Sequence, residues 1–361
     1  MSEPGLRFPN STKPDPFRAP LRGSSVQVSS ATVSRAQRLR AHLGLTTNAS
    51  GLSRAVGRRS FLSSILRGGI GFGMAYSLAP TFVVVSGAGS APRGHLAWVW
   101  QFTEDGEPER VRSVLAANRL GIVLKTHDGT DWMGEFDDSE IPITGPGQIS
   151  RLARFFEAGG VPFHAWCVVK GLEPEREAAM AAEAVNAGAR SLFLDLEPSD
   201  GGHFWEGTPE SALAFGRLFR RLQPGAWLSV APDPRPWQVE AVPVAEFATF
   251  SNEFAPQAYW DQFDNDATKD LLLERGIVAG FEGVTPELTL DLSQASLAPF
   301  GLPIRPIGEG ASSMSSWRRF VAGARNLGMG SVSVWRYGTS NPGVWRLLRE
   351  TPPQAGSLPR V

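Results

Sequence analysis

Short apolar runs alternate with amphipathic segments from residue 95 almost to the end of the chain. A run that is apolar at consecutive positions is typical of a strand in a parallel sheet, because helices cover both faces of such a sheet. Apolar residues that recur every three or four positions indicate a helix with one buried face. These patterns predict eight strands, over residues 95–102, 120–126, 161–169, 191–197, 227–231, 254–260, 302–307 and 331–335. They predict helices over residues 107–118, 148–158, 173–187, 209–222, 244–250, 267–275, 314–327 and 342–349.

Strands and helices in this alternating order predict a (β/α)8 TIM barrel of the α/β class over residues 92–361. The alternative is an open, doubly wound sheet. Many such sheets carry a Gly-rich phosphate loop after the first strand, and none follows residues 95–102. We therefore expect one barrel domain with its functional residues at the C-terminal ends of the strands.

The N-terminal quarter of the chain has a different composition. Residues 1–57 are rich in Ser, Pro and Arg and poor in large apolar residues, which predicts a disordered basic region. Residues 58–91 begin with Arg58-Arg59, continue through a weakly apolar stretch and end in small residues. This order resembles a bacterial twin-arginine signal segment. A chance arginine pair in a basic linker is the alternative interpretation.

A twin-arginine signal implies export to the periplasm or the extracellular space, with the twin-arginine translocation machinery as a partner. Cleavage is expected near Ala91. Without cleavage, the uncharged run over residues 70–91 is long enough to remain as a membrane anchor. We expect no contact with a membrane other than through this segment.

Charge and cysteine content narrow the classes of function. Residues 92–361 hold 24 of the 35 basic and 34 of the 36 acidic residues, a net charge of about −10, which disfavours nucleic acid as a partner. Cys167 is the lone cysteine and lies in an apolar run, so we expect a buried, inert thiol. The five histidines lack the spacing of a metal site, and no cofactor motif is present. We therefore expect no metal and no cofactor.

The fourth predicted strand ends in two acids, Asp195 and Glu197, just before Pro198. Side chains alternate between the two faces of a strand, so both carboxyl groups point to the same side. Two neighbouring carboxyl groups raise each other's pKa, and such pairs are typical of functional sites. They are the first candidates for catalytic residues.

Polar and aromatic residues stand at or near the ends of the other strands, and together they are typical of a carbohydrate site. Tryptophan faces stack on sugar rings, whereas amide and carboxyl groups bond to hydroxyls. The candidates for substrate binding are Lys125, His164, Trp166, Asp233, Gln257, Trp260, Glu309 and Trp335. Tyr259 is a third catalytic candidate.

The Asp195-x-Glu197 pair, the run Gln257-Ala258-Tyr259-Trp260 and the aromatic end of the eighth strand resemble barrel glycoside hydrolases. Phage-type lysozymes (muramidases) and, more distantly, chitinase-like enzymes are the similar groups. The chain departs from the lysozyme pattern at the end of the first strand, where Trp100-Gln101 replaces an Asp. It keeps only the last Asp-x-Glu of the longer chitinase motif.

The resemblance implies that Glu197 is a general acid and that Asp195 orients Glu197 or a substrate acetamido group. It implies that Tyr259 supports the reacting sugar. A second carboxylate could act as nucleophile or base, and the candidates are Asp128, Asp233 and Glu309. We expect the sugar platform to consist of Trp166, Trp260 and Trp335.

Structural interpretations remain open for each of these residues. Asp195 could form an ion pair with Lys125 or Arg305, the tryptophans could be core residues, and His164 could be a satisfied interior residue.

Three functions are compatible with the sequence. The first is an exported glycoside hydrolase that acts on a polysaccharide such as peptidoglycan. The second is a non-catalytic carbohydrate-binding or cell-surface scaffold barrel, which the missing acid on the first strand favours. The third is another hydrolase on the same fold, such as a phosphodiesterase, which would need metal ligands among His127, Asp128, Asp195 and Glu197.

Overall fold

The computed structural model describes residues 91–137, 139–199, 201–280 and 282–353. These residues belong to one compact unit of the chain, which spans residues 68–361. The predicted basic region, residues 1–57, and the predicted signal segment, residues 58–91, lie outside the described residues except for Ala91. Among the described residues, no helix has the length and hydropathy needed to cross a bilayer.

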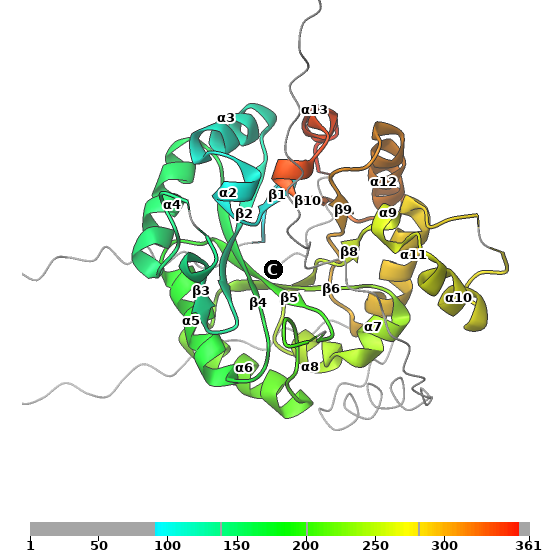
Figure 1. Ribbon diagram of the computed structural model, residues 1–361, viewed down its shortest axis with the longest axis horizontal. Coiled ribbons are helices and arrows are strands. Elements are labelled where there is room, and N and C mark those ends of the chain that lie inside the picture. The colour runs from blue at the N-terminus through cyan, green and yellow to red at the C-terminus, as the bar shows by residue number, and fades with distance from the viewer. Residues whose placement is uncertain (1–90, 138, 200, 281, 354–361) are drawn as a thin grey trace, which may run out of the picture. The chain divides into compact units, whose positions relative to one another are not determined.

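A ring of helices surrounds a parallel sheet (Figure 1). The strands follow the predicted order, with β1 at Leu96–Val99, β2 at Gly121–Asp128, β4 at Phe163–Val168, β5 at Ser191–Leu196, β6 at Trp227–Pro232, β7 at Glu253–Phe254, β8 at Gln257–Ala258, β9 at Ile307–Glu309 and β10 at Ser333–Trp335. These strands pair in parallel in the order β7-β6-β5-β4-β2-β1-β10-β9-β8. A short β3, Asp131–Trp132, pairs antiparallel with β2.

The sheet closes through one extended segment, residues 253–258. Its first half, β7, pairs with β6, and its second half, β8, pairs with β9. The backbone also bonds to both sides, because Ala255 N donates to Val230 O at 2.7 Å and Ile307 N donates to Pro256 O at 2.8 Å. β7 and β8 therefore occupy one strand position of an eight-stranded barrel, and the predicted (β/α)8 fold is confirmed.

The helices alternate with these strands as expected for the fold. They are α2 at Phe102–Asp105, α3 at Pro108–Asn118, α4 at Pro146–Ala158, α5 at Pro174–Asn186, α6 at Pro209–Leu222, α7 at Pro236–Ala241, α8 at Val244–Ala248, α9 at Trp260–Phe263, α10 at Asp266–Glu274, α11 at Pro286–Leu297, α12 at Met314–Asn326 and α13 at Pro342–Glu350. Many begin with Pro, whose fixed φ suits the first helical position and whose missing N–H has no partner to lose there.

The first strand and the helix α11 are among the elements that differ from the sequence prediction. The first strand is shorter than residues 95–102, because the Asp105 carboxylate accepts a hydrogen bond from Trp100 N at 2.6 Å and the chain turns into α2. The helix α11 was not predicted. Its buried face includes Thr289 and Ser293, whose hydroxyls bond back to carbonyls of the same helix, so the apolar periodicity is weak.

Aromatic side chains fill the middle of the barrel. The ring of Trp98 lies 5.3 Å from Trp166, 5.4 Å from Phe193 and 6.1 Å from Trp335, measured between centroids. The indole N–H of Trp166 donates to Val99 O at 2.9 Å. This aromatic layer, Trp98, Trp166, Phe193 and Trp335, makes the interior a packed core rather than a pore.

A buried ion pair lies at the N-terminal end of the barrel. Arg305 Nε donates to a Glu253 oxygen at 2.6 Å, and both side chains are almost fully buried. The Arg305 guanidinium also donates to Gly94 O, Pro92 O and the hydroxyl of Ser331. Arg305, which precedes β9, therefore joins the first residue of β7 to segments that precede β1 and β10. Arg305 was considered as an ion-pair partner of Asp195, but it precedes β9 and lies at the opposite end of the barrel.

We expect Arg305→Met to lower the free energy of unfolding by about 3–5 kcal/mol, because it leaves the Glu253 charge buried without a partner. Chemical denaturation measures the change. Arg319→Met is the matched control, since Arg319 and Glu287 form an exposed pair and should contribute no more than about 1 kcal/mol. Equal losses in the two variants would contradict the role given to Arg305.

Candidate active site

Asp195 and Glu197 lie at the C-terminal end of β5, in the mouth of the barrel. In the sheet register, Asp195 is paired with Val168 of β4 and with Ala231 of β6. Its side chain is only 9% exposed, whereas Glu197 keeps partial contact with solvent. The two carboxyl groups also act on each other, which raises the pKa of Asp195 and lowers that of Glu197.

The amide of Gln257 holds both acids from the segment of β7 and β8, which lies beyond β6. Its Nε2 donates to Asp195 Oδ1 at 2.8 Å and to Glu197 Oε1 at 2.9 Å, and it lies 3.3 Å from Ala231 O. Gln257 is the first residue of β8 and is itself buried. A buried glutamine amide that meets two carboxyl oxygens fixes the position of both acids.

Burial shifts the pKa of each acid, and nearby charges add to the shift. Burial is the largest cause that raises the pKa of Glu197 to about 7, and the negative charge of Asp233 adds to it. The hydrogen bond from Gln257 opposes this shift. Burial and then the charge of Glu197 raise the pKa of Asp195 well above its usual range, although Lys125 opposes the shift. The pair therefore retains a proton near neutral pH.

Lys125 does not form an ion pair with Asp195. Its Nζ bonds to Asp128 Oδ2 at 2.8 Å, and Lys170 Nζ lies 2.8 Å from the other oxygen of Asp128. Burial would raise the pKa of Asp128, but the two lysines outweigh it and hold the pKa below its usual value. The Lys125 ammonium also lies 4.9 Å from the centre of the Trp166 ring. A structural ion pair of Asp195 with Lys125 or Arg305 is therefore excluded by the geometry.

The other candidate carboxylates are engaged as well. Arg235 binds Asp233 with its backbone N–H, at 2.9 Å, and with its guanidinium, whose Nε lies 3.0 Å from both carboxylate oxygens. Glu309 accepts hydrogen bonds from the backbone N–H groups of Asp261 and Gln262 at the start of α9. Arg235 is a residue that the sequence analysis missed, although the Asp233-x-Arg235 spacing was visible.

Tyr259 is 6% exposed and lies close enough to the acid pair to feel the charge of both acids. Burial is the largest cause that raises its pKa well above the usual value, and the charges of Asp195, Glu197, Glu309 and Asp233 follow. The phenol therefore stays protonated and can donate a hydrogen bond in the barrel mouth.

The three tryptophans predicted as a platform are in different environments. Trp335 is partly exposed and packs with its ring 5.4 Å from Trp166. Trp166 is 2% exposed and belongs to the aromatic layer, so it supports Trp335 from below. Trp260 is 1% exposed and packs against Trp317 and Phe320 of α12. The prediction that Trp166 and Trp260 form an open platform is wrong, because core packing covers both rings.

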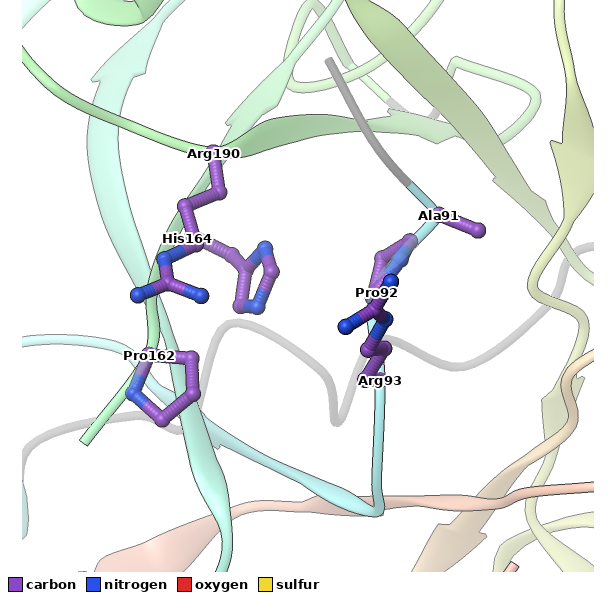
Figure 2. Close-up of a pocket in the computed structure, with 6 residues that line it drawn as sticks. All are labelled: Ala91, Pro92, Arg93, Pro162, His164 and Arg190. Carbon is purple, nitrogen blue, oxygen red and sulfur yellow. The ribbon is translucent and has the colours of Figure 1, made fainter. Parts of the chain in front are cut away.

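His164 was also expected at the mouth, and this prediction is wrong. It lies near the N-terminal end of β4, two residues before Trp166, and lines a pocket at the opposite end of the barrel (Figure 2). Its Nδ1 lies 2.7 Å from the hydroxyl of Ser191. Because side chains alternate along a strand, His164 and Trp166 share the interior face but lie at different depths.

Asp105 and Arg336 join the ends of the first and last strands at the mouth. Arg336 Nη1 donates to Asp105 Oδ1 at 3.0 Å, and Gly338 N donates to the same oxygen at 2.8 Å. Burial raises the pKa of Asp105, although Arg336 opposes the shift. No pattern in the sequence predicted this pair, because its members are 231 positions apart. Among the described residues, no group of three or more His, Cys, Asp or Glu side chains is arranged to hold a metal.

Comparison with known proteins agrees with the fold. No family profile matches the chain, and no curated protein sequence is similar to it. Among solved structures, a family 18 N-acetylglucosaminidase from Paenibacillus barengoltzii is 10% identical with a TM-score of 0.50, and the match covers 72% of this chain and 100% of that one. The spore cortex-lytic enzyme SleL of Bacillus cereus is 13% identical with a TM-score of 0.46, over 72% and 74% of the two chains. The catalytic domain of a Pyrococcus furiosus chitinase is 11% identical with a TM-score of 0.46, over 76% and 99%. At these identities, the likeness to the N-acetylglucosaminidase shows the barrel fold.

We expect Gln257→Met to raise the pKa of Glu197 above about 7, because the variant removes the hydrogen bond that favours the charged carboxylate. NMR titration of carbon-13-labelled glutamate side chains measures the pKa. Gln294→Met is the matched control, since Gln294 is an exposed residue of α11. An unchanged titration of Glu197 in Gln257→Met would contradict the proposed effect of the amide.

Proposed function

We propose that this protein is a glycoside hydrolase that cleaves polysaccharides containing N-acetylated amino sugars, such as chitin or peptidoglycan. The observation that carries the proposal is the acid pair held by Gln257 in the barrel mouth. Glu197, with its pKa raised to about 7, is protonated often enough at neutral pH to donate a proton to a glycosidic oxygen.

The spacing of the carboxyl groups supports a substrate-assisted mechanism. The Nε2 atom of Gln257 bonds to Asp195 Oδ1 at 2.8 Å and to Glu197 Oε1 at 2.9 Å, so the two carboxyl groups lie side by side and cannot flank a sugar ring as acid and nucleophile. Asp128 and Asp233 are each bound by basic side chains, and Glu309 caps α9. The acetamido group of the substrate is therefore the proposed nucleophile, with its carbonyl oxygen attacking the anomeric carbon.

Each neighbour of the acid then has a role. Glu197 donates its proton to the leaving oxygen and later takes a proton from water. Asp195 orients the acetamido N–H, and its own raised pKa allows it to share a proton with Glu197. Tyr259 donates a hydrogen bond to the acetamido oxygen. The partly exposed ring of Trp335 supports the apolar face of the sugar.

A non-catalytic sugar-binding barrel is the second candidate. The observation that favours it is Phe193, which occupies the interior position before Asp195 and packs its ring against Trp98 and His164. β5 thus carries fewer acids than the chitinase motif, which would suit a barrel that binds glycans without cleaving them.

We expect the protein to hydrolyse chito-oligosaccharides or peptidoglycan and Glu197→Gln to lose about 10²–10⁴-fold in kcat, the usual contribution of general acid catalysis. Glu183→Gln, an exposed substitution on α5, is the control and should be fully active. Product analysis by mass spectrometry measures turnover. Binding without turnover in the unmodified protein would support the second candidate instead.

The rate should also depend on pH. The raised pKa of Glu197 means that the acid is protonated below about 7 and loses its proton above it, so kcat/KM should fall as the pH rises through about 7. A rate that stays constant from pH 6 to pH 9 would contradict the assignment of Glu197.

Export by the twin-arginine route is part of the same proposal and is supported by the sequence Arg58-Arg59 before a weakly apolar stretch. We expect the double variant Arg58→Lys, Arg59→Lys to stay inside a bacterial host, whereas the unchanged chain reaches the periplasm or the medium. Immunoblots of cell fractions measure the distribution, with Arg38→Lys, Arg40→Lys as the control.

A further inference from the structure

A pocket of about 120 Å³ opens at the N-terminal end of the barrel, opposite the acid pair. Ala91, Pro92 and Arg93 line it on one side, and Pro162, His164 and Arg190 line it on the other. Figure 2 shows the imidazole of His164 between Arg190 and the segment of Pro92 and Arg93. A water molecule occupies about 30 Å³ of liquid, so the pocket has room for about four waters or for one small polyatomic ion.

His164 provides the deepest polar group of this pocket. The residue is 1% exposed, and its Nε2 has no hydrogen-bond partner among the described residues. Its Nδ1 lies within hydrogen-bond distance of Ser191 Oγ. When Ser191 donates to Nδ1, the neutral ring carries its proton on Nε2, which then faces the pocket as a donor. Burial, and then Arg305 and Arg190, lower the pKa of His164 to about 3, so the ring is neutral at pH 7.

The charges around the pocket favour an anion. The charge of Arg190 is neutralised by Glu157, whose carboxylate lies 2.6 Å from Arg190 Nε. The charge of Arg305 is neutralised by Glu253, whose carboxylate lies 2.6 Å from Arg305 Nε. Arg93 is exposed and has no acidic partner within the described part of the chain. One uncompensated positive charge therefore faces a pocket that already holds a neutral donor. The Nη1 group of Arg190 is not used by Glu157, which takes Nε and Nη2.

We propose that this pocket is a binding site for a small oxyanion, of the class of inorganic phosphate or sulfate. The guanidinium groups of Arg93 and Arg190 bind the anion from two sides, and Nε2–H of His164 donates to it from below. Bidentate guanidinium contacts and a fixed N–H are typical of such sites. The site is independent of the proposed hydrolase activity, because it lies at the other end of the barrel. An anion bound there would tie the start of the barrel domain to β4 and β5 and stabilise the folded state.

The test is a titration of the full chain with inorganic phosphate at constant ionic strength, with chloride as the reference salt. We expect saturable binding by calorimetry and a melting temperature that rises with phosphate concentration. Arg93→Gln should weaken binding by about tenfold or more, since it removes a charged hydrogen-bond donor at an exposed position that folding does not need. Arg318→Gln, an exposed arginine on α12, is the matched control and should bind as the unmodified protein does.

A second measurement reports on His164 directly. In nitrogen-15 NMR of labelled histidines, saturating phosphate should shift the His164 ring signals and leave them in the Nε2–H tautomer. Competition by sulfate would support an oxyanion site. The proposal is overturned if phosphate acts no differently from chloride, if Arg93→Gln binds as tightly as the control, or if the His164 signals do not move.

Discussion

Barrel closure at residues 253–258 is the constraint on which the rest of the structure depends. This segment pairs with β6 through Glu253 and Phe254 and with β9 through Gln257 and Ala258. The same six residues therefore bring the buried partner of Arg305 to one end of the barrel and the amide that holds Asp195 and Glu197 to the other. Barrel closure brings Gln257 within 3 Å of Asp195 and Glu197, which stand about 60 positions earlier in the chain.

Among the described residues, the basic side chains of the barrel mouth form ion pairs with acids other than Asp195 and Glu197. Asp128 forms ion pairs with Lys125 and Lys170. Asp233 forms an ion pair with Arg235, and Asp105 forms one with Arg336. Nearby basic side chains thus exist, but their partners neutralise them. Burial then dominates at Asp195 and Glu197 and raises both pKa values, and the charge of Glu197 adds to the shift of Asp195. This is the physical condition for a carboxyl group that acts as an acid near neutral pH.

The strand order and the position of Asp195 and Glu197 could be predicted from the sequence, because both depend on local patterns of apolar and polar residues. The depth of each side chain could not. The side chains of His164 and Trp166 point to the same face of β4. His164 nevertheless lines the pocket at the N-terminal end of the barrel, whereas Trp166 belongs to the aromatic layer. Trp260 stands one residue after Tyr259, but its ring turns outward to Trp317 of α12. The pairing of Asp105 with Arg336 depends on closure between distant strands and leaves no local pattern.

The aromatic layer separates the two ends of the barrel electrostatically. Along β5, the inward positions change from the hydroxyl of Ser191, which meets His164, through the ring of Phe193 to the carboxyl group of Asp195. Arg305 contributes to the low pKa of His164, whereas the largest shifts of Asp195 come from burial, Glu197 and Lys125. A buried arginine would lower the pKa of a nearby acid and spoil its use as a proton donor. The packed rings of Trp98, Trp166 and Phe193 lie between Arg305 and the acid pair, so this buried arginine does not neutralise the acids at the mouth.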